Sequence, residues 1–452
     1  MIKKFLCILF LSVMLAGCSD DPVDAPEQKD PEETVTPEDP EEETPGEETP
    51  PEEEDPEPPQ EQPEDNRAME FRVHRVFVET ENHAAIKSKE EYVPCSVSID
   101  SDDPDWCFEN VEAGIRGRGN STWLWYPKKP YRIKFDSKQK VLGLGKAKSW
   151  VLLANYRDPT DLMNTYVFEM GQALNMPFTN HNRYVWLTLN GEEMGLYQLT
   201  EQVQQGSNRV EVDDDEGRLL SLDVDDGPGE APDAGDNFWS TMYRMPVCVK
   251  HPENQTPQQL DNIRGEFSIL EQAIKSGTYE EAEALIDMTV LADYLLIQEL
   301  VYNVELDAPR SMYIHRDKDS KWTMGPLWDF DAGYDFDWGQ MYTGHKFFSR
   351  YNELVMGKNP YTREGASYDP PRFFTDLFRH EQFRTIYKIE WKKIKSLHEN
   401  VWAITNEYVT DNRWDAEQDL WPISLLWDGQ VTAMKNWLNN RIVFLDSFIP
   451  GL

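Results

Sequence analysis

The chain has 452 residues and a formal net charge of −39 at pH 7. A chain of this length can bury a sizeable hydrophobic core, and aromatic residues, 12% of the total, supply material for it. The strong acidity argues against nucleic acid as a partner, because a surface that binds nucleic acid needs clustered positive charge.

Residues 1–17 have the features of a signal peptide. Lys3 and Lys4 precede an apolar run at residues 5–15, which is too short to cross a bilayer as a helix. The run ends in Leu-Ala-Gly followed by Cys18, the pattern of a lipobox. We therefore predict cleavage before Cys18 and attachment of lipid to its thiol. The alternative is an ordinary secretory signal with a cysteine there by chance.

The lipid on Cys18 is then the predicted attachment to the membrane, because no later stretch is long and apolar enough to span one. Residues 19–21, Ser-Asp-Asp, resemble the acidic export signal of bacterial surface lipoproteins. That resemblance implies the outer leaflet of the outer membrane, with the body of the protein facing outward.

Residues 18–66 form a segment of low complexity. Between Asp20 and Asp65 there are 22 acidic residues, 12 prolines and one basic residue, Lys29. Such a segment buries too little apolar surface to fold, its charges repel one another, and proline stiffens it. We predict a disordered, semi-extended stalk, with a binding role for the acidic run as the alternative.

Residues 67–203 are predicted to be rich in strands. Residues 70–80 and 93–99 have strand character, and residues 131–135 alternate strictly between apolar and basic side chains. Residues 184–189 and 195–200 flank Asn190-Gly191, which favours a type I′ turn and a hairpin. A disulfide between Cys95 and Cys107 is one option, since Cys248, the third cysteine of the body, cannot complete a second pair.

Helices are predicted within and after the strands. Residues 160–174 carry an apolar stripe at helical spacing, with Glu169 at its edge, where the carboxylate needs a cation or solvent. Residues 204–452 are predicted to be mostly helical, with helices at 260–275, 287–303, 373–398 and 430–448. Strands with one helix, followed by mostly helices, indicate a two-lobed α+β body.

Carboxylates gather around a predicted hairpin in the second half of the chain. Residues 311–316 and 322–328 form its two strands, so that residue 308 is expected to lie across from residue 329. Asp307, Asp329 and Asp331 then meet at its open end. Neighbouring carboxylates repel unless a metal or a proton intervenes, and such hard oxygen ligands suit Mg²⁺ or Mn²⁺. The alternative is an acidic loop on a surface hairpin.

Several motifs in collinear order resemble the CotH kinase family, named for a spore-coat protein. They cover about residues 86–337. The motifs are Ile115-Arg116-Gly117-Arg118-Gly119-Asn120-Ser121-Thr122-Trp123, Lys128-Lys129-Pro130-Tyr131-Arg132-Ile133-Lys134-Phe135, Trp150-Val151-Leu152-Leu153-Ala154-Asn155-Tyr156, Leu189-Asn190-Gly191 with Gly195-Leu196-Tyr197, Thr200-Glu201-Gln202, and Trp328-Asp329-Phe330-Asp331.

The resemblance implies an atypical fold like that of protein kinases and the use of ATP with Mg²⁺ or Mn²⁺ to phosphorylate Ser or Thr of a protein substrate. By the same resemblance, Asp307 would orient the acceptor hydroxyl, and Asp329 would bind metal with help from Asp331. Lys134 would hold phosphate and pair with Glu169. Further nucleotide-binding positions would be Arg116, Gly117, Arg118, Gly119, Glu201 and Lys129, the last being the alternative to Lys134.

One position departs from the family pattern. Members often carry Asn shortly before the Tyr of the strand that follows the catalytic Asp, whereas this chain has Ser311 before Met312 and Tyr313. Two functions therefore stand as hypotheses. The first is an active, secreted and lipid-anchored kinase, and the second is a catalytically inactive surface lipoprotein on the same fold that binds glycan or a protein partner.

Overall fold

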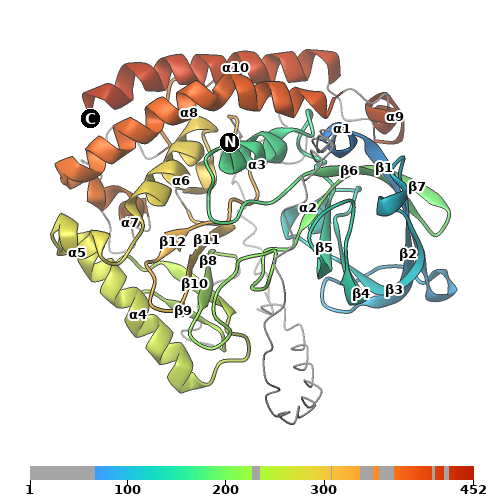
Figure 1. Ribbon diagram of the computed structural model, residues 1–452, viewed down its shortest axis with the longest axis horizontal. Coiled ribbons are helices and arrows are strands. Elements are labelled where there is room, and N and C mark those ends of the chain that lie inside the picture. Colours follow the sequence, from blue (N-terminus) through green and yellow to red (C-terminus); the bar gives the residue numbers. More distant parts are fainter. Residues whose placement is uncertain are drawn as a thin grey trace, which may run out of the picture.

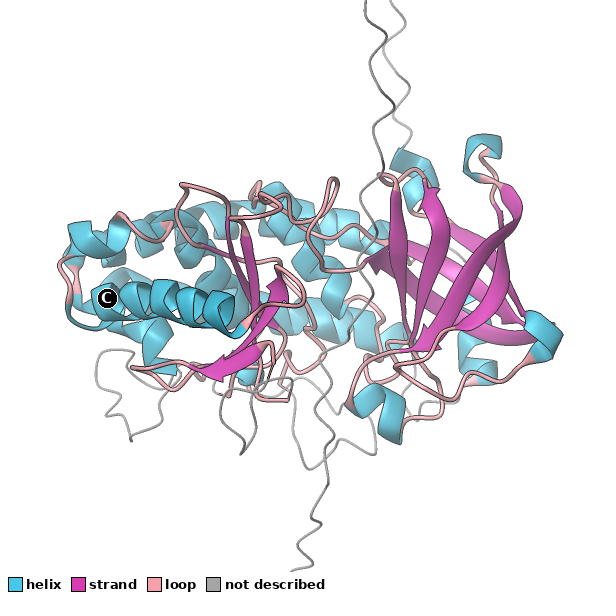
Figure 2. Cartoon of the chain, turned by 90° about the horizontal axis from the view of Figure 1, so that it is seen from below, coloured by secondary structure: helices cyan, strands magenta, loops and turns pink. Residues whose placement is uncertain are grey.

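The computed structural model of the chain describes residues 67–225, 235–306, 308–335, 350–355, 371–409, 413–421 and 427–452. Its architecture is mixed α+β, as predicted (Figure 1). A barrel lies beside a second part in which helices pack around a smaller sheet, and Figure 2 shows the two parts side by side from below. No helix in the described part of the chain is long and apolar enough to cross a membrane.

Seven strands close into the barrel in the order β1-β2-β3-β4-β5-β7-β6. The closing pair, β1 with β6, is parallel, and the other pairs are antiparallel. The strands are β1 (Val73–Thr80), β2 (Val93–Asp100), β3 (Phe108–Gly117), β4 (Tyr131–Gln139), β5 (Ala147–Leu153), β6 (Arg183–Leu189) and β7 (Glu192–Glu201).

The alternation of side chains between the two faces of each strand decides which residues fill the barrel. Tyr131, Ile133 and Phe135 of β4 enter its core together with Ile115 of β3 and Trp150 of β5, because successive side chains of a strand point to opposite faces. The predicted hairpin of β6 and β7 is confirmed. Its turn residues have positive φ, 52° at Asn190 and 79° at Gly191, as a type I′ turn requires.

A second, five-stranded antiparallel sheet has the order β12-β11-β8-β10-β9. Its strands are β8 (Arg218–Leu222), β9 (Asn237–Trp239), β10 (Pro246–His251), β11 (Met312–Arg316) and β12 (Thr323–Met324). The sequence predicted only the hairpin of β11 and β12 in this region. Residues 218–251 were missed because β8 and β10 are buried on both faces and so lack an alternating pattern.

Most of the helices lie around this sheet, whereas α1, α2 and α9 lie at the barrel (Figure 1). Their bounds are α1 (Arg67–Glu70), α2 (Ser121–Trp125), α3 (Met163–Ala173), α4 (Pro257–Ser276), α5 (Tyr279–Glu283), α6 (Met288–Leu300), α7 (Pro371–Thr375), α8 (Glu381–Glu407), α9 (Arg413–Leu420) and α10 (Trp427–Phe448). The helix predicted at 373–398 is divided into α7, a 3-10 turn and α8, because His380 has extended backbone angles. Each of the other predicted helices is present.

Cys95 and Cys107 are both free thiols, so the optional disulfide between them does not form. The Cys95 side chain faces the barrel core, and burial raises its pKa to about 12. The Sγ atom of Cys107 instead contacts the backbone of Ser101.

Candidate active site

Asp329 and Asp331 lie in the segment that follows β12, residues 325–335. This segment is tied to the start of α3, since the backbone N–H of Phe330 donates to Asn164 (2.8 Å) and the Tyr334 hydroxyl donates to the carbonyl of Met163 (2.9 Å). Asp331 accepts a hydrogen bond from Arg157 at 2.8 Å. The buried Arg157 guanidinium also donates to the Asp331 carbonyl, so it fixes the position of this carboxylate.

Ser311 is the partner of Asp329. Its hydroxyl donates to Asp329 Oδ2 at 3.1 Å, and its backbone N–H donates to Asp223 at 2.8 Å. The predicted pairing of residue 308 with residue 329 does not form, because the second strand of the hairpin ends earlier than predicted. β12 ends at Met324, where Gly325 has a φ of 122° and Pro326 has no N–H to donate to a ladder. The chain therefore brings Asp329 to the start of β11.

Burial and mutual repulsion make ionisation of Asp329 and Glu305 unfavourable. Burial and the neighbouring Asp331 raise the pKa of Asp329 to about 6, against the opposing charges of Arg118 and Arg157. Glu305 lies in the 3-10 turn after α6, Val304–Leu306, and burial with Asp329 and Asp331 raises its pKa well above the usual range. Its Oε2 atom is buried and has no hydrogen-bond partner among the described residues. Like charges this close favour a cation among them.

A row of three arginines lies on the outer face of the barrel, and its charge influences these carboxylates. Arg116 and Arg132 are cross-strand neighbours on β3 and β4, and both are buried. Arg118 follows at the end of β3, with its guanidinium 5.3 Å from the centre of the Trp328 ring. Burial lowers the pKa of Arg118 and the charges of Arg132 and Arg116 lower it further, while Asp329 opposes the shift. At the end of the Arg116–Arg118–Arg132 row, the charge of Arg118 thus interacts with that of Asp329.

The glycines of the Arg-Gly-Arg-Gly motif have different roles. A Cβ atom at Gly117 would lie 2.4 Å from the Trp123 ring, so Gly117 allows α2 to pack against the end of β3. Gly119 has a φ of 78°, which side chains rarely adopt. The nearest atom to a Cβ there would be 3.6 Å away, so Gly119 is needed for its backbone conformation.

The predicted ion pair between Lys134 and Glu169 does not form. Glu169 is 4% exposed and accepts hydrogen bonds from Arg67 (2.8 Å), Asn182 (3.2 Å) and Tyr408 (3.0 Å). Its helix, α3, packs against α8, so that the carboxylate faces α1 and the end of α8. Lys134 is half-buried on β4, in register with Gly114 and Ser149 of the adjoining strands.

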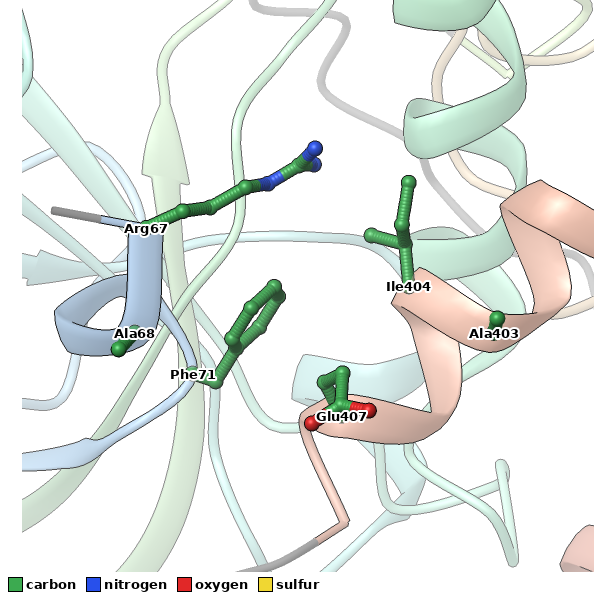
Figure 3. Close-up of a pocket in the computed structure, with 6 residues that line it drawn as sticks. All are labelled: Arg67, Ala68, Phe71, Ala403, Ile404 and Glu407. Carbon is green, nitrogen blue, oxygen red and sulfur yellow. The ribbon is translucent and has the colours of Figure 1, made fainter. Parts of the chain in front are cut away.

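A pocket of about 380 Å³ lies beside the Arg67–Glu169 ion pair (Figure 3). Arg67, Ala68 and Phe71 line one side of it, and the other side is formed by α8. The residues from α8 are Ala403, Ile404 and Glu407. Arg116, Arg118, Arg132, Asp329, Asp331 and Glu305 are not among the residues that line this pocket.

Two other predicted nucleotide-binding residues make contacts within the protein. The Lys129 ammonium donates to the Trp123 carbonyl and lies 5.7 Å from the centre of its ring, so it stabilises α2. Glu201 accepts from the backbone and the ring of His181, both at 2.8 Å. Burial would raise the pKa of Glu201, but His181 and Arg209 outweigh burial and lower it.

The structure therefore brings together Arg116, Arg118, Asp329 and Asp331 from the predicted set. It adds Arg132, Arg157 and Glu305, which the sequence reasoning missed. Arg132 had a visible signal, because it shares the basic face of residues 131–135 with Lys134. Asp307 and Cys18 lie outside the described residues. Within the described ranges, no three His, Cys, Asp or Glu side chains are arranged so that they could hold a metal by themselves.

Comparison with known protein families identifies a family whose matched range includes the residues of this site. The profile of the family described as CotH kinase protein matches residues 115–445, a range that contains the arginine row and the carboxylates. A search of curated proteins found no match to the chain. Because the matched range covers well over half of its length, the chain belongs to the CotH kinase family.

Proposed function

We propose that this protein transfers the γ-phosphoryl group of ATP to Ser or Thr of a protein substrate, with Mg²⁺ or Mn²⁺ as the metal. The observation that carries the proposal is the position of Arg118, at the end of the Arg116–Arg118–Arg132 row, over the ring of Trp328, the residue next to Asp329. Phosphoryl transfer depends mostly on positioning and on electrostatic stabilisation, and a cationic row facing metal-binding carboxylates supplies both.

The arginine row is suited to the triphosphate. Guanidinium groups bind phosphate oxygens through paired N–H donors. Within the residues that the structure describes, the Nε atom of the buried Arg116 has no hydrogen-bond partner, which leaves it a donor for an anion. Burial lowers the pKa of Arg118 and the charges of Arg132 and Arg116 lower it further, and a bound polyanion would oppose this shift.

The carboxylates fit a divalent metal by their chemistry. Asp329 and Asp331 offer hard oxygen donors, and the unpartnered Oε2 of Glu305 adds a third oxygen nearby. Mg²⁺ in nucleotide sites is held by one or two carboxylates and completed by phosphate oxygens and water, so a cage of three protein ligands is not required. When bound, the metal would neutralise charge on the phosphates, while Arg157 keeps Asp331 oriented.

In this proposal the protein works as a two-lobed kinase. The strand-rich lobe, residues 67–203, contains the barrel and the arginine row, and the lobe of residues 204–452 contributes Asp329, Asp331 and Ser311. ATP would bind between them, and Asp307 would orient the acceptor hydroxyl. The direct test is incubation of the purified body with labelled ATP and Mn²⁺ or Mg²⁺. Label on a Ser or Thr supports the proposal, and no ATP binding at any metal concentration would exclude it.

Arg118→Ala should weaken metal-dependent ATP binding by about tenfold or more, because a partly desolvated guanidinium–phosphate contact contributes roughly 1.5–3 kcal/mol. Calorimetric titration with ATP and Mn²⁺ measures the change. Arg75→Ala is the matched control, since Arg75 is an exposed arginine on β1 of the same barrel. Equal losses in the two variants would show a nonspecific charge effect instead of a phosphate contact.

We also propose that the body is tethered to the outer membrane by lipid on Cys18, beyond the stalk at residues 18–66. Cys18→Ala should leave the protein without lipid, since only the thiol takes the diacylglycerol. In detergent phase partitioning the variant should move from the detergent phase to the aqueous phase. If the variant stays in the detergent phase as fully as the unmutated protein, the lipid anchor is wrong.

One observation favours the second hypothesis, a surface protein that binds glycan or a protein partner. Leu124 and Trp125 of α2 are 63% and 45% exposed, and exposed apolar side chains side by side are typical of binding surfaces. This function would persist without ATP. Binding of a glycan or protein ligand that is unaffected by metal chelation, in a protein that does not bind ATP, would favour it.

A further inference from the structure

Glu305 is held firmly in the site although no motif predicted it. Its backbone N–H donates to the side chain of Asn303 at 3.2 Å. The residues around it are joined to the carboxylate segment, since Tyr334 N–H donates to the Val301 carbonyl at 2.6 Å and Val304 N–H donates to the Ala332 carbonyl at 3.4 Å. The turn that carries Glu305 therefore keeps a fixed position relative to Asp329 and Asp331.

Burying the carboxylate of Glu305 in that position costs free energy. It is 8% exposed, and its Oε2 atom accepts no hydrogen bond from any residue in the described part of the chain. The charged groups acting on it are Asp329 and Asp331, which repel it, and Arg157 and Arg310, which attract it. Arg157 is bonded to Asp331, and Arg310 forms an ion pair with Asp225 at 3.0 Å. An oxygen buried without a donor, beside like charges, costs free energy unless a ligand satisfies it.

We propose that Glu305 Oε2 is a metal-facing oxygen of the nucleotide site, acting together with Asp329. A divalent cation would coordinate the unpartnered oxygen and would also offset the repulsion between the two carboxylates. The hydroxyl of Ser311, which donates its hydrogen to Asp329 Oδ2, is not an equivalent ligand, because its oxygen carries no negative charge. The inference rests on the proposed function, since phosphate oxygens of the nucleotide would complete the coordination.

The test is Mn²⁺ binding followed by electron paramagnetic resonance, with and without a nonhydrolysable ATP analogue. Glu305→Gln keeps the size of the side chain and removes its charge. We expect the affinity for Mn²⁺ to fall about tenfold or more. Removal of a repelled carboxylate should leave the melting temperature of the metal-free protein unchanged or higher, which separates loss of metal from loss of fold.

Glu271→Gln is the matched control. Glu271 of α4 is fully buried, but its carboxylate accepts hydrogen bonds from Ser240 and from the backbone of residues 241–243. This variant should lose stability and keep its Mn²⁺ affinity. If Asp329→Asn loses Mn²⁺ and Glu305→Gln keeps it, the role of Glu305 is wrong and the proposed function stands. If the unmutated protein binds no Mn²⁺ with nucleotide, both fail.

Discussion

Asp329→Asn should weaken metal-dependent ATP binding by about a hundredfold, the largest functional effect that we expect from a single substitution. The carboxylate is the metal ligand in the proposed site, and without a cation the triphosphate would approach Asp329, Asp331 and Glu305 against their repulsion. Calorimetry with ATP and Mn²⁺ measures the loss. Asp307→Asn is the contrasting variant, expected to keep binding and to lose transfer.

The same substitution should stabilise the metal-free protein above about pH 6. Burial and Asp331 raise the pKa of Asp329 from 3.8 to about 6 in the folded state. Folding therefore takes up a proton between these two values, and the carboxylate lowers stability progressively as the pH rises through that window. Thermal melts in chelator should show a higher melting temperature for Asp329→Asn at pH 7.5 and no difference near pH 3. A lower melting temperature at pH 7.5 would contradict this electrostatic account.

Lys128→Ala should lower the free energy of unfolding by about 3–5 kcal/mol, because it leaves the Glu417 carboxylate buried without its cation. Lys128 and Glu417 are 1% and 3% exposed and form an ion pair that joins the barrel to α9. Glu417 also accepts from the backbone N–H of Leu196 on β7. Urea denaturation followed by circular dichroism measures the loss.

Lys138→Ala is the control for Lys128→Ala, since Lys138 is exposed on β4 and should contribute almost nothing to stability. The double variant Lys128→Met with Glu417→Leu should recover most of the lost stability, because replacing both charges removes the unpaired carboxylate. A loss below about 1 kcal/mol in Lys128→Ala would show that Glu417 reaches water or another donor when Lys128 is removed.

The sequence by itself determined the local elements. Strict alternation at residues 131–135 identified β4, Asn190-Gly191 identified the hairpin of β6 and β7, and apolar spacing identified α3. Each of these signals depends on residues only a few positions apart, and periods of 2 and 3.6 report which face of an element is buried. The motif Trp328-Asp329-Phe330-Asp331 is also a local signal, and it pointed to the two carboxylates of the site.

Only the tertiary structure decided how these elements close and which charges meet. The barrel closes through a parallel pair between β1 and β6, over 100 residues apart, for which no local pattern exists. Glu169 is bonded to Arg67 instead of Lys134 because α3 packs against α8. Arg157 bonds Asp331 across 174 residues, and Arg118, at the end of a barrel strand, lies over the ring of Trp328 in the segment that follows the second sheet. The partner of a buried charge is set by long-range packing. The period of a single element reports only which of its faces is buried, so it does not identify that partner.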